Sequence, residues 1–192
     1  MPVLSAAATT LCADIAALLR AAPARAGRHR VLAIEGRSGA GKSWLADLLA
    51  NRLAAPVLRM DDLYPGWDGL AASPPLARRW IIEPLLAGSA PRWRRYDWER
   101  GEPGAWEHTP VAGTLLIEGC GSGATELRAH LSLLVWVDAP PPVRAERLAR
   151  RFDAAVYSPY HELWRRQEDA FYARHRVRDH ADVIVDNAAA AG

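Results

Sequence analysis

One stretch decides the fold of this chain: Gly36-Arg37-Ser38-Gly39-Ala40-Gly41-Lys42-Ser43, which fits the pattern G-x-x-x-x-G-K-[ST] at every defined position. The apolar run 31–34 precedes it and predicts a short buried strand. Residues 42–53 follow with the periodicity of a helix. Strand, glycine-rich loop and helix in this order are the context that the motif requires. We therefore interpret residues 36–43 as a phosphate-binding loop.

Lys42 is the only lysine of the 192 residues, because every other member of the 24 basic residues is an arginine. A compact ammonium can reach between the β and γ phosphates of a nucleoside triphosphate, whereas a planar guanidinium has the wrong shape for that role. GTPases that read guanine through an Asn-Lys-x-Asp motif need a second lysine, so the composition excludes that class. An ATP-using kinase or an ATPase remains.

The loop predicts which residues bind the nucleotide. Backbone N–H groups and the first turn of the helix hold phosphate oxygens. Lys42 is expected to bridge the β and γ phosphates, and the Ser43 hydroxyl to bind Mg²⁺. ATP and Mg²⁺ are thus the expected cofactors. The expected nucleotide-binding residues are Gly36, Ser38, Gly39, Ala40, Gly41, Lys42, Ser43 and Trp44.

The rest of the chain alternates apolar strands with helical segments. The runs 56–60, 114–119, 133–138 and 182–186 predict four more strands, and 76–86, 140–152 and 160–175 predict helices. This alternation predicts an α/β three-layer sandwich with a five-stranded parallel sheet, the P-loop nucleoside triphosphate hydrolase fold. We expect one domain over 1–192, with a hairpin or excursion over 92–108. A leading amphipathic helix within 1–28 is expected to place Leu4, Leu11, Ile15, Leu18 and Leu19 on one side.

Composition limits the partners and the setting. The net charge of +2 argues against a long polyanion such as nucleic acid. No apolar run approaches the roughly 20 residues that span a bilayer. Cys12 and Cys120 form neither a disulfide framework nor a metal-ligand spacing. We expect a cytoplasmic protein that binds neither nucleic acid nor membrane, and the oligomeric state stays open.

Carboxylates follow two of the predicted strands. Asp61-Asp62 comes after the second strand, and Glu118 ends the third. Doubly wound sheets bind ligands at the carboxyl ends of their strands. Phosphoryl transfer to an alcohol needs a base near the attacking oxygen and a carboxylate that organises the metal. Alternatively, Asp61-Asp62 forms an Asx turn or helix cap, and Glu118 pairs with an arginine.

Three segments resemble the uridine kinase family. Asp61-Asp62-Leu63-Tyr64 is similar to its Asp-x-Phe-Tyr motif, Tyr96-Asp97-Trp98 to its Tyr-Asp-Phe segment, and Leu116-Ile117-Glu118-Gly119 to its apolar-Glu-Gly strand end. They follow the loop in the family's order, so the resemblance covers about residues 31–153 and the last strand. It implies a kinase that transfers the γ-phosphoryl group of ATP to a hydroxyl of a nucleoside-like acceptor.

The resemblance also implies roles for single residues. Asp61 would take the proton from the acceptor hydroxyl, and Glu118 would hold Mg²⁺ through water. Within an acceptor-binding excursion over about 62–110, Tyr64 and Tyr96 would line the pocket and Asp97 would bind hydroxyls. The family has a histidine and an arginine shortly after Tyr-Asp-Phe, whereas this chain has Glu99-Arg100-Gly101. The phosphoryl-transfer half therefore resembles the family better than the acceptor-reading half does.

An arginine-rich helix follows the fourth strand, and helical spacing puts Arg144, Arg147 and Arg151 on one face. These arginines belong either to a lid over about 144–160 that neutralises the transferring phosphoryl group, or to a solvated helix face. The resemblance favours Arg147 and Arg151 as catalytic residues. Further along, Arg165-Arg166 beside Gln167-Glu168-Asp169 predicts ion pairs on a helix surface.

Three other functions compete with a small-molecule kinase. A nucleotide-dependent ATPase or switch needs no acceptor. A nucleoside monophosphate kinase would use Arg94, Arg95 and Arg100 to hold the acceptor phosphate. A polynucleotide 5′-hydroxyl kinase needs a basic groove, which the charge balance does not suggest. The Asp61 base and the aromatic residues of 93–98 favour the small-molecule kinase.

Overall fold

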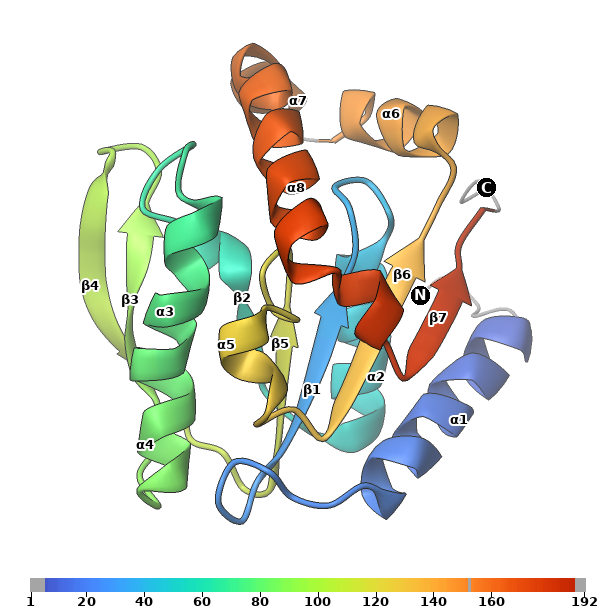
Figure 1. Ribbon diagram of the computed structural model, residues 1–192, viewed down its shortest axis with the longest axis vertical. Coiled ribbons are helices and arrows are strands. Elements are labelled where there is room, and N and C mark those ends of the chain that lie inside the picture. The colour runs from blue at the N-terminus through green and yellow to red at the C-terminus, as the bar shows by residue number, and fades with distance from the viewer. Residues whose placement is uncertain (1–5, 152, 189–192) are drawn as a thin grey trace.

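A five-stranded parallel sheet organises the computed structural model, which describes residues 6–151 and 153–188. The strands lie in the order β2-β5-β1-β6-β7 (Figure 1), and each neighbouring pair is parallel. Their bounds are β1 Arg30–Glu35, β2 Val57–Arg59, β5 Thr114–Glu118, β6 Leu133–Asp138 and β7 Val183–Asp186. The predicted α/β fold with its five parallel strands is confirmed.

Helices cover both faces of this sheet. Leu32 and Ile34 of β1 pack in one core with α1 (Ala6–Ala21) and α2 (Lys42–Leu53). Val31 and Ala33 point to the other face, which is covered by α3 (Ser73–Ala77), α4 (Glu83–Leu86), α5 (Thr125–Arg128) and α8 (His161–His175). Because both faces of the sheet are buried, its strands read as continuous apolar runs.

The predicted side of the leading helix is partly wrong. The buried residues of α1 include Ile15 and Leu19, but Leu18 is 49 % exposed. The small residues Ala8 and Ala16 also pack inward, which moves the centre of the buried stripe away from Leu18. Leu4, which was expected on the same side, lies outside the described residues.

The predicted excursion contains a helix and a hairpin. A π-helical turn over Arg78–Ile82 joins α3 to α4. The hairpin pairs β3 (Arg92–Asp97) with β4 (Glu102–His108) in antiparallel fashion. Beyond β6 come α6 (Pro141–Ala149) and the short α7 (Ala154–Tyr157). The arginine-rich helix therefore ends earlier than predicted, and Phe152 in the expected lid lies outside the described residues.

The glycine-rich loop links β1 to α2 at the carboxyl edge of the sheet, as Figure 1 shows. Gly36 has φ 147° and Gly39 has φ 78°, in the region that favours glycine. A Cβ atom on Gly36 would lie 2.3 Å from the carbonyl oxygen of Val137. Glycine is thus required there by the neighbouring strand as well as by the turn.

Candidate active site

A cavity of about 780 Å³ opens beside the glycine-rich loop. Its walls come from that loop, the segment after β2, the end of β5, the hairpin turn, the region after α6, and α8. The lining residues are Ser38, Gly39, Gly41, Lys42, Ser43, Trp44, Asp61, Tyr64, Trp67, Trp98, Glu99, Glu118, Cys120, Arg147, Arg151, Asp153, Val156, Tyr157 and Trp164. Eleven of the residues predicted from the sequence are therefore brought together around one space.

The ammonium of Lys42 lies at the buried end of this cavity. It donates to the carbonyl oxygen of Arg37 at 3.2 Å and contacts the Cys120 Sγ at 3.7 Å. Burial lowers the pKa of Lys42, but the groups around it, the Cys120 sulfur and the Glu118 carboxylate foremost, raise the pKa more. The ammonium is therefore protonated at neutral pH and ready to bind an anion.

Ser43 and Glu118 form the candidate magnesium site. The Ser43 hydroxyl donates to Glu118 Oε1 at 3.3 Å, while Arg59 donates to Glu118 Oε2 at 2.9 Å. Glu118 thus pairs with an arginine, as one interpretation expected, and also faces the loop. Burial raises the pKa of Glu118, and Lys42 and Arg59 oppose that rise.

The donor set at this position fits Mg²⁺. A hydroxyl and a carboxylate are hard oxygen ligands, and Mg²⁺ in phosphate-binding proteins keeps few protein ligands beside phosphate oxygens and water. Within residues 6–151 and 153–188, no cluster of three or more metal-binding side chains occurs. Ser43 and Glu118 would therefore share the ion with the nucleotide.

Asp61 and Asp62 occupy different environments after β2. The two lie in a 3₁₀ turn over Met60–Asp62. Asp61 lines the cavity, whereas Asp62 is half-buried and pairs with Arg95 at 3.6 Å. Burial raises the pKa of Asp62, and Arg95 opposes that rise. Only Asp61 is thus placed to contact a molecule in the cavity.

Aromatic rings gather around Trp67, which lines the cavity together with Trp98 and Tyr157. Trp67 stacks on Tyr160 with ring centroids 4.4 Å apart and an interplanar angle of 5°. Trp98 and Tyr157 contact the same Trp67 ring at 4.8 and 6.0 Å. We call these four residues the Trp67 cluster. The cluster joins three segments that are far apart in the sequence. No local sequence motif indicates that these rings meet.

Two of the four predicted acceptor-binding residues lie outside the cavity lining that the described residues form. Asp97 Oδ1 accepts the backbone N–H groups of Glu99 and Arg100 and so closes the hairpin turn. Tyr96 packs edge-on against Trp98, with ring centroids 5.1 Å apart. Tyr64 does line the cavity, but its hydroxyl donates to the Cys120 carbonyl at 2.8 Å and its ring is buried.

Two arginines of the predicted lid contact the glycine-rich loop, and two others pair with carboxylates. Arg144 donates to the Ser38 carbonyl at 3.3 Å, and Arg147 donates to the carbonyls of the next two loop residues, also at 3.3 Å. Arg150 instead pairs with Glu146 on the exposed face of α6. Arg151, beyond the helix, binds Asp153 through two hydrogen bonds of 2.8 and 2.7 Å. Arg147 and Arg151 line the cavity, as the lid interpretation requires.

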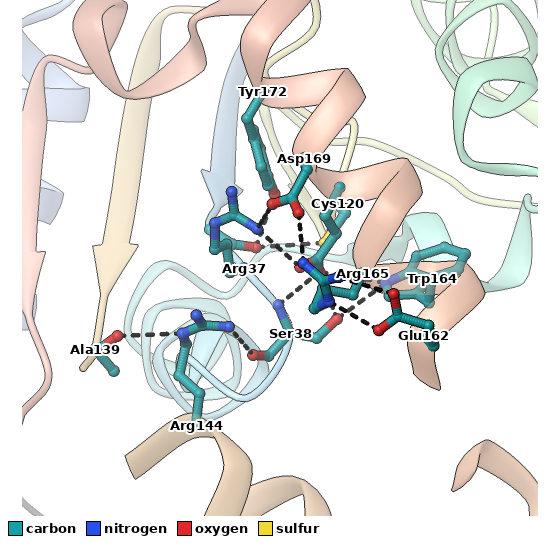
Figure 2. Close-up of polar contacts among 12 residues, drawn as sticks. Arg37, Ser38, Cys120, Ala139, Arg144, Glu162, Trp164, Arg165, Asp169 and Tyr172 are labelled. Carbon is teal, nitrogen blue, oxygen red and sulfur yellow. Dashed lines mark hydrogen bonds and ion pairs between the residues drawn. The ribbon is translucent and has the colours of Figure 1, made fainter. Parts of the chain in front are cut away.

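Helix α8 contacts the loop on the side away from Arg144 (Figure 2). The sequence interpretation missed this contact. Glu168 was expected on a helix surface, but it is 2 % exposed and accepts hydrogen bonds from Ser38. Trp164 donates to the Ser38 hydroxyl at 3.0 Å, and Tyr172 donates to the Gly36 carbonyl at 3.0 Å. These three side chains recur every fourth residue and so share one helix face. The expected surface ion pairs do form through Arg165, which binds Glu162 and Asp169.

A second buried carboxylate lies directly under the loop. Glu35 ends β1 and is fully buried. Its Oε2 atom accepts the backbone N–H groups of Gly121 and Gly123 at 2.9 and 2.8 Å, and its Oε1 accepts the Tyr172 hydroxyl at 2.9 Å. Burial raises the pKa of Glu35 to about 7, although these hydrogen bonds favour the ionised form.

Comparison with solved structures identifies the fold. A possible uridine kinase from Bacillus stearothermophilus superposes with a TM-score of 0.66 at 20% identity, covering 93% of this chain and 97% of that one. The chain has the P-loop kinase fold. A candidate fructose transport system kinase from Silicibacter sp. TM1040 gives a TM-score of 0.58 at 20% identity, with 92% and 98% covered.

Other comparisons agree with a P-loop kinase fold or find nothing. Shikimate kinase from Bacteroides thetaiotaomicron gives a TM-score of 0.51 at 18% identity, covering 82% of this chain and 86% of that one. No family model matches the chain, and no curated protein matches its sequence. Among the described residues, no helix has both the length and the apolar character needed to cross a membrane.

Proposed function

We propose that this protein is an ATP-dependent small-molecule kinase that phosphorylates a hydroxyl of a neutral, nucleoside-like acceptor. One observation carries the proposal: a single cavity is lined by the phosphate-binding residues Lys42 and Ser43 and also by Asp61 and three rings of the Trp67 cluster. An ATPase or switch needs only the phosphate-binding residues, so Asp61 and the aromatic rings favour a kinase.

Each group of cavity residues would have its own role in phosphoryl transfer. Lys42 would bind the β and γ phosphates of ATP, and Ser43 with Glu118 would hold the Mg²⁺ that neutralises charge on them. Asp61 would accept the proton of the acceptor hydroxyl. Arg147 and Arg151 would stabilise the charge that develops on the transferred group.

The charges near the Trp67 cluster favour a neutral acceptor over a monophosphate. Arg94 donates to the backbone carbonyls of Gly104 and Pro103, and Arg95 pairs with Asp62. Within residues 6–151 and 153–188, the cavity lining includes neither of them nor Arg100. Arg151 lies 5.5 Å from the centroid of the Tyr157 ring, but it pairs with Asp153 and is assigned above to the transferred group. A phosphate on the acceptor would thus lack an available partner.

The solved neighbours support the kinase part of this proposal. Their names describe kinases for different acceptors, so the acceptor is argued from this cavity alone. The Trp67 cluster offers flat apolar faces that suit a base ring or the apolar face of a sugar. Cys12 and Cys120 are free thiols, which suits the cytoplasmic setting that we propose.

Steady-state ATP consumption in the presence of Mg²⁺ tests the proposal. The acceptors to compare are uridine, cytidine, their 5′-monophosphates and a set of neutral sugars. We expect turnover with a nucleoside and none with a monophosphate. Turnover with monophosphates alone would make the protein a nucleotide kinase. ATP hydrolysis that no alcohol accelerates would favour the ATPase.

A further inference from the structure

We propose that Glu168 is a positioning residue that holds the phosphate-binding loop in its nucleotide-binding shape before ATP arrives. The proposal rests on the use of ATP by that loop, as proposed above. Glu168 Oε1 accepts the backbone N–H of Ser38 at 2.8 Å and the Ser38 hydroxyl at 2.7 Å. Ser38 is the third residue of the loop and lines the cavity, so the contact reaches the nucleotide site directly.

Hydrogen-bond donors surround the Glu168 carboxylate. Besides the two groups of Ser38, Trp164 Nε1 donates to Oε1 at 3.2 Å and Cys120 Sγ donates at 3.3 Å. Arg37 approaches Oε2 at 3.6 Å. A carboxylate that is 2 % exposed is costly unless donors compensate it, and here four donors and one cation do so.

Electrostatic attraction cannot be the role of this carboxylate, because it repels the phosphates that the loop binds. Its effect must therefore act through the shape of the loop. On the other side, Arg144 holds the Ser38 carbonyl and Arg147 holds the carbonyls of the two residues that follow. Figure 2 shows Ser38 between Arg144 of α6 and Trp164 of α8. Ser38 is thus bound through its N–H, its hydroxyl and its carbonyl.

A preformed loop binds a nucleotide without the loss of conformational freedom that an open loop would suffer. A hydrogen bond to a charged group contributes enough to change an equilibrium by about 10- to 100-fold. We therefore expect Glu168→Gln to weaken the binding of a fluorescent ATP analogue with Mg²⁺ by about that factor. We expect KM for ATP to rise by a similar factor, with a smaller change in kcat at saturating ATP.

Glu162→Gln is the matched control. Glu162 lies on the same helix α8, and its carboxylate pairs with Arg165 and Arg166 at the surface. We expect the control to bind the analogue within about twofold of wild type, because exposed ion pairs contribute little. Both variants should give the circular dichroism spectrum of wild type at the assay temperature.

A double-mutant cycle with Ser38→Ala connects Glu168 to the loop. Ser38→Ala removes the hydroxyl and keeps the N–H, so its effect on affinity should shrink in the Glu168→Gln background. Independent, additive effects of the two substitutions would contradict the proposal. Binding by Glu168→Gln that equals wild type would overturn it while leaving the proposed kinase intact. A wild-type chain that binds no ATP would instead refute the proposed function.

Hydrogen exchange in the nucleotide-free wild type tests the same contact without a variant, in case Glu168→Gln fails to fold. The Ser38 N–H should exchange slowly before any nucleotide is added, because a buried carboxylate holds it. Fast exchange that slows only when ATP binds would show that the nucleotide, and not Glu168, shapes the loop.

Discussion

Replacing Glu35 by glutamine tests the electrostatics under the phosphate-binding loop. Burial raises the pKa of this carboxyl from 4.5 to about 7. The folded state therefore holds its proton more tightly than the unfolded state does. The resulting stabilisation is present below pH 4.5 and is lost as the pH rises to about 7. At about 1.4 kcal/mol for each pH unit between these values, the loss is about 3 kcal/mol.

Urea unfolding at several pH values between about 5 and 8 measures this loss. We expect the unfolding free energy of wild type to fall toward pH 8 relative to Glu35→Gln. The pH slope is the readout, because the amide also faces the N–H donors of Gly121 and Gly123 and so lowers stability at every pH. Glu83→Gln, at an exposed carboxyl, is the control and should keep the wild-type slope.

Parallel curves for wild type and Glu35→Gln would refute this reasoning. They would mean that Glu35 is ionised throughout, because its hydrogen bonds from Gly121, Gly123 and Tyr172 offset the effect of burial.

The remaining predictions concern turnover. Lys42→Ala should lower it by roughly 10²-fold or more with circular dichroism unchanged, and near-wild-type turnover would exclude the proposed phosphate site. Asp61→Asn should lower kcat by about 10²–10⁴-fold with little change in ATP affinity. Asp62→Asn should be milder because Asp62 pairs with Arg95; if it proves the more damaging, the assignment is shifted by one residue. Trp67→Ala should raise KM for the acceptor about tenfold and leave KM for ATP unchanged. Trp106→Ala, on the exposed face of the hairpin, is its control, and equal effects of the two would contradict an acceptor wall.

The sequence by itself determined the fold and the candidate phosphate-binding loop. The glycine-rich loop, the strand before it and the helix after it are consecutive in the sequence. A motif of consecutive residues can be recognised from their spacing alone. Both core faces of the sheet are buried, so the strands could be recognised as apolar runs. Asp61 and Glu118 could be placed near the loop because parallel strands end at one edge.

Only the tertiary structure decided which side chains surround that loop and form the Trp67 cluster. Ser38 and Glu168 are 130 positions apart, and no local pattern links them. The charged run around Glu168 indicated a surface, since periodicity tells which helix face a residue shares but not what covers that face. Likewise, Asp97 binds backbone groups of its own turn, while Trp67, which belongs to no motif, meets Trp98 and Tyr160 from distant segments. Burial of a carboxylate or clustering of aromatic rings depends on partners that only the folded chain brings within a few ångströms.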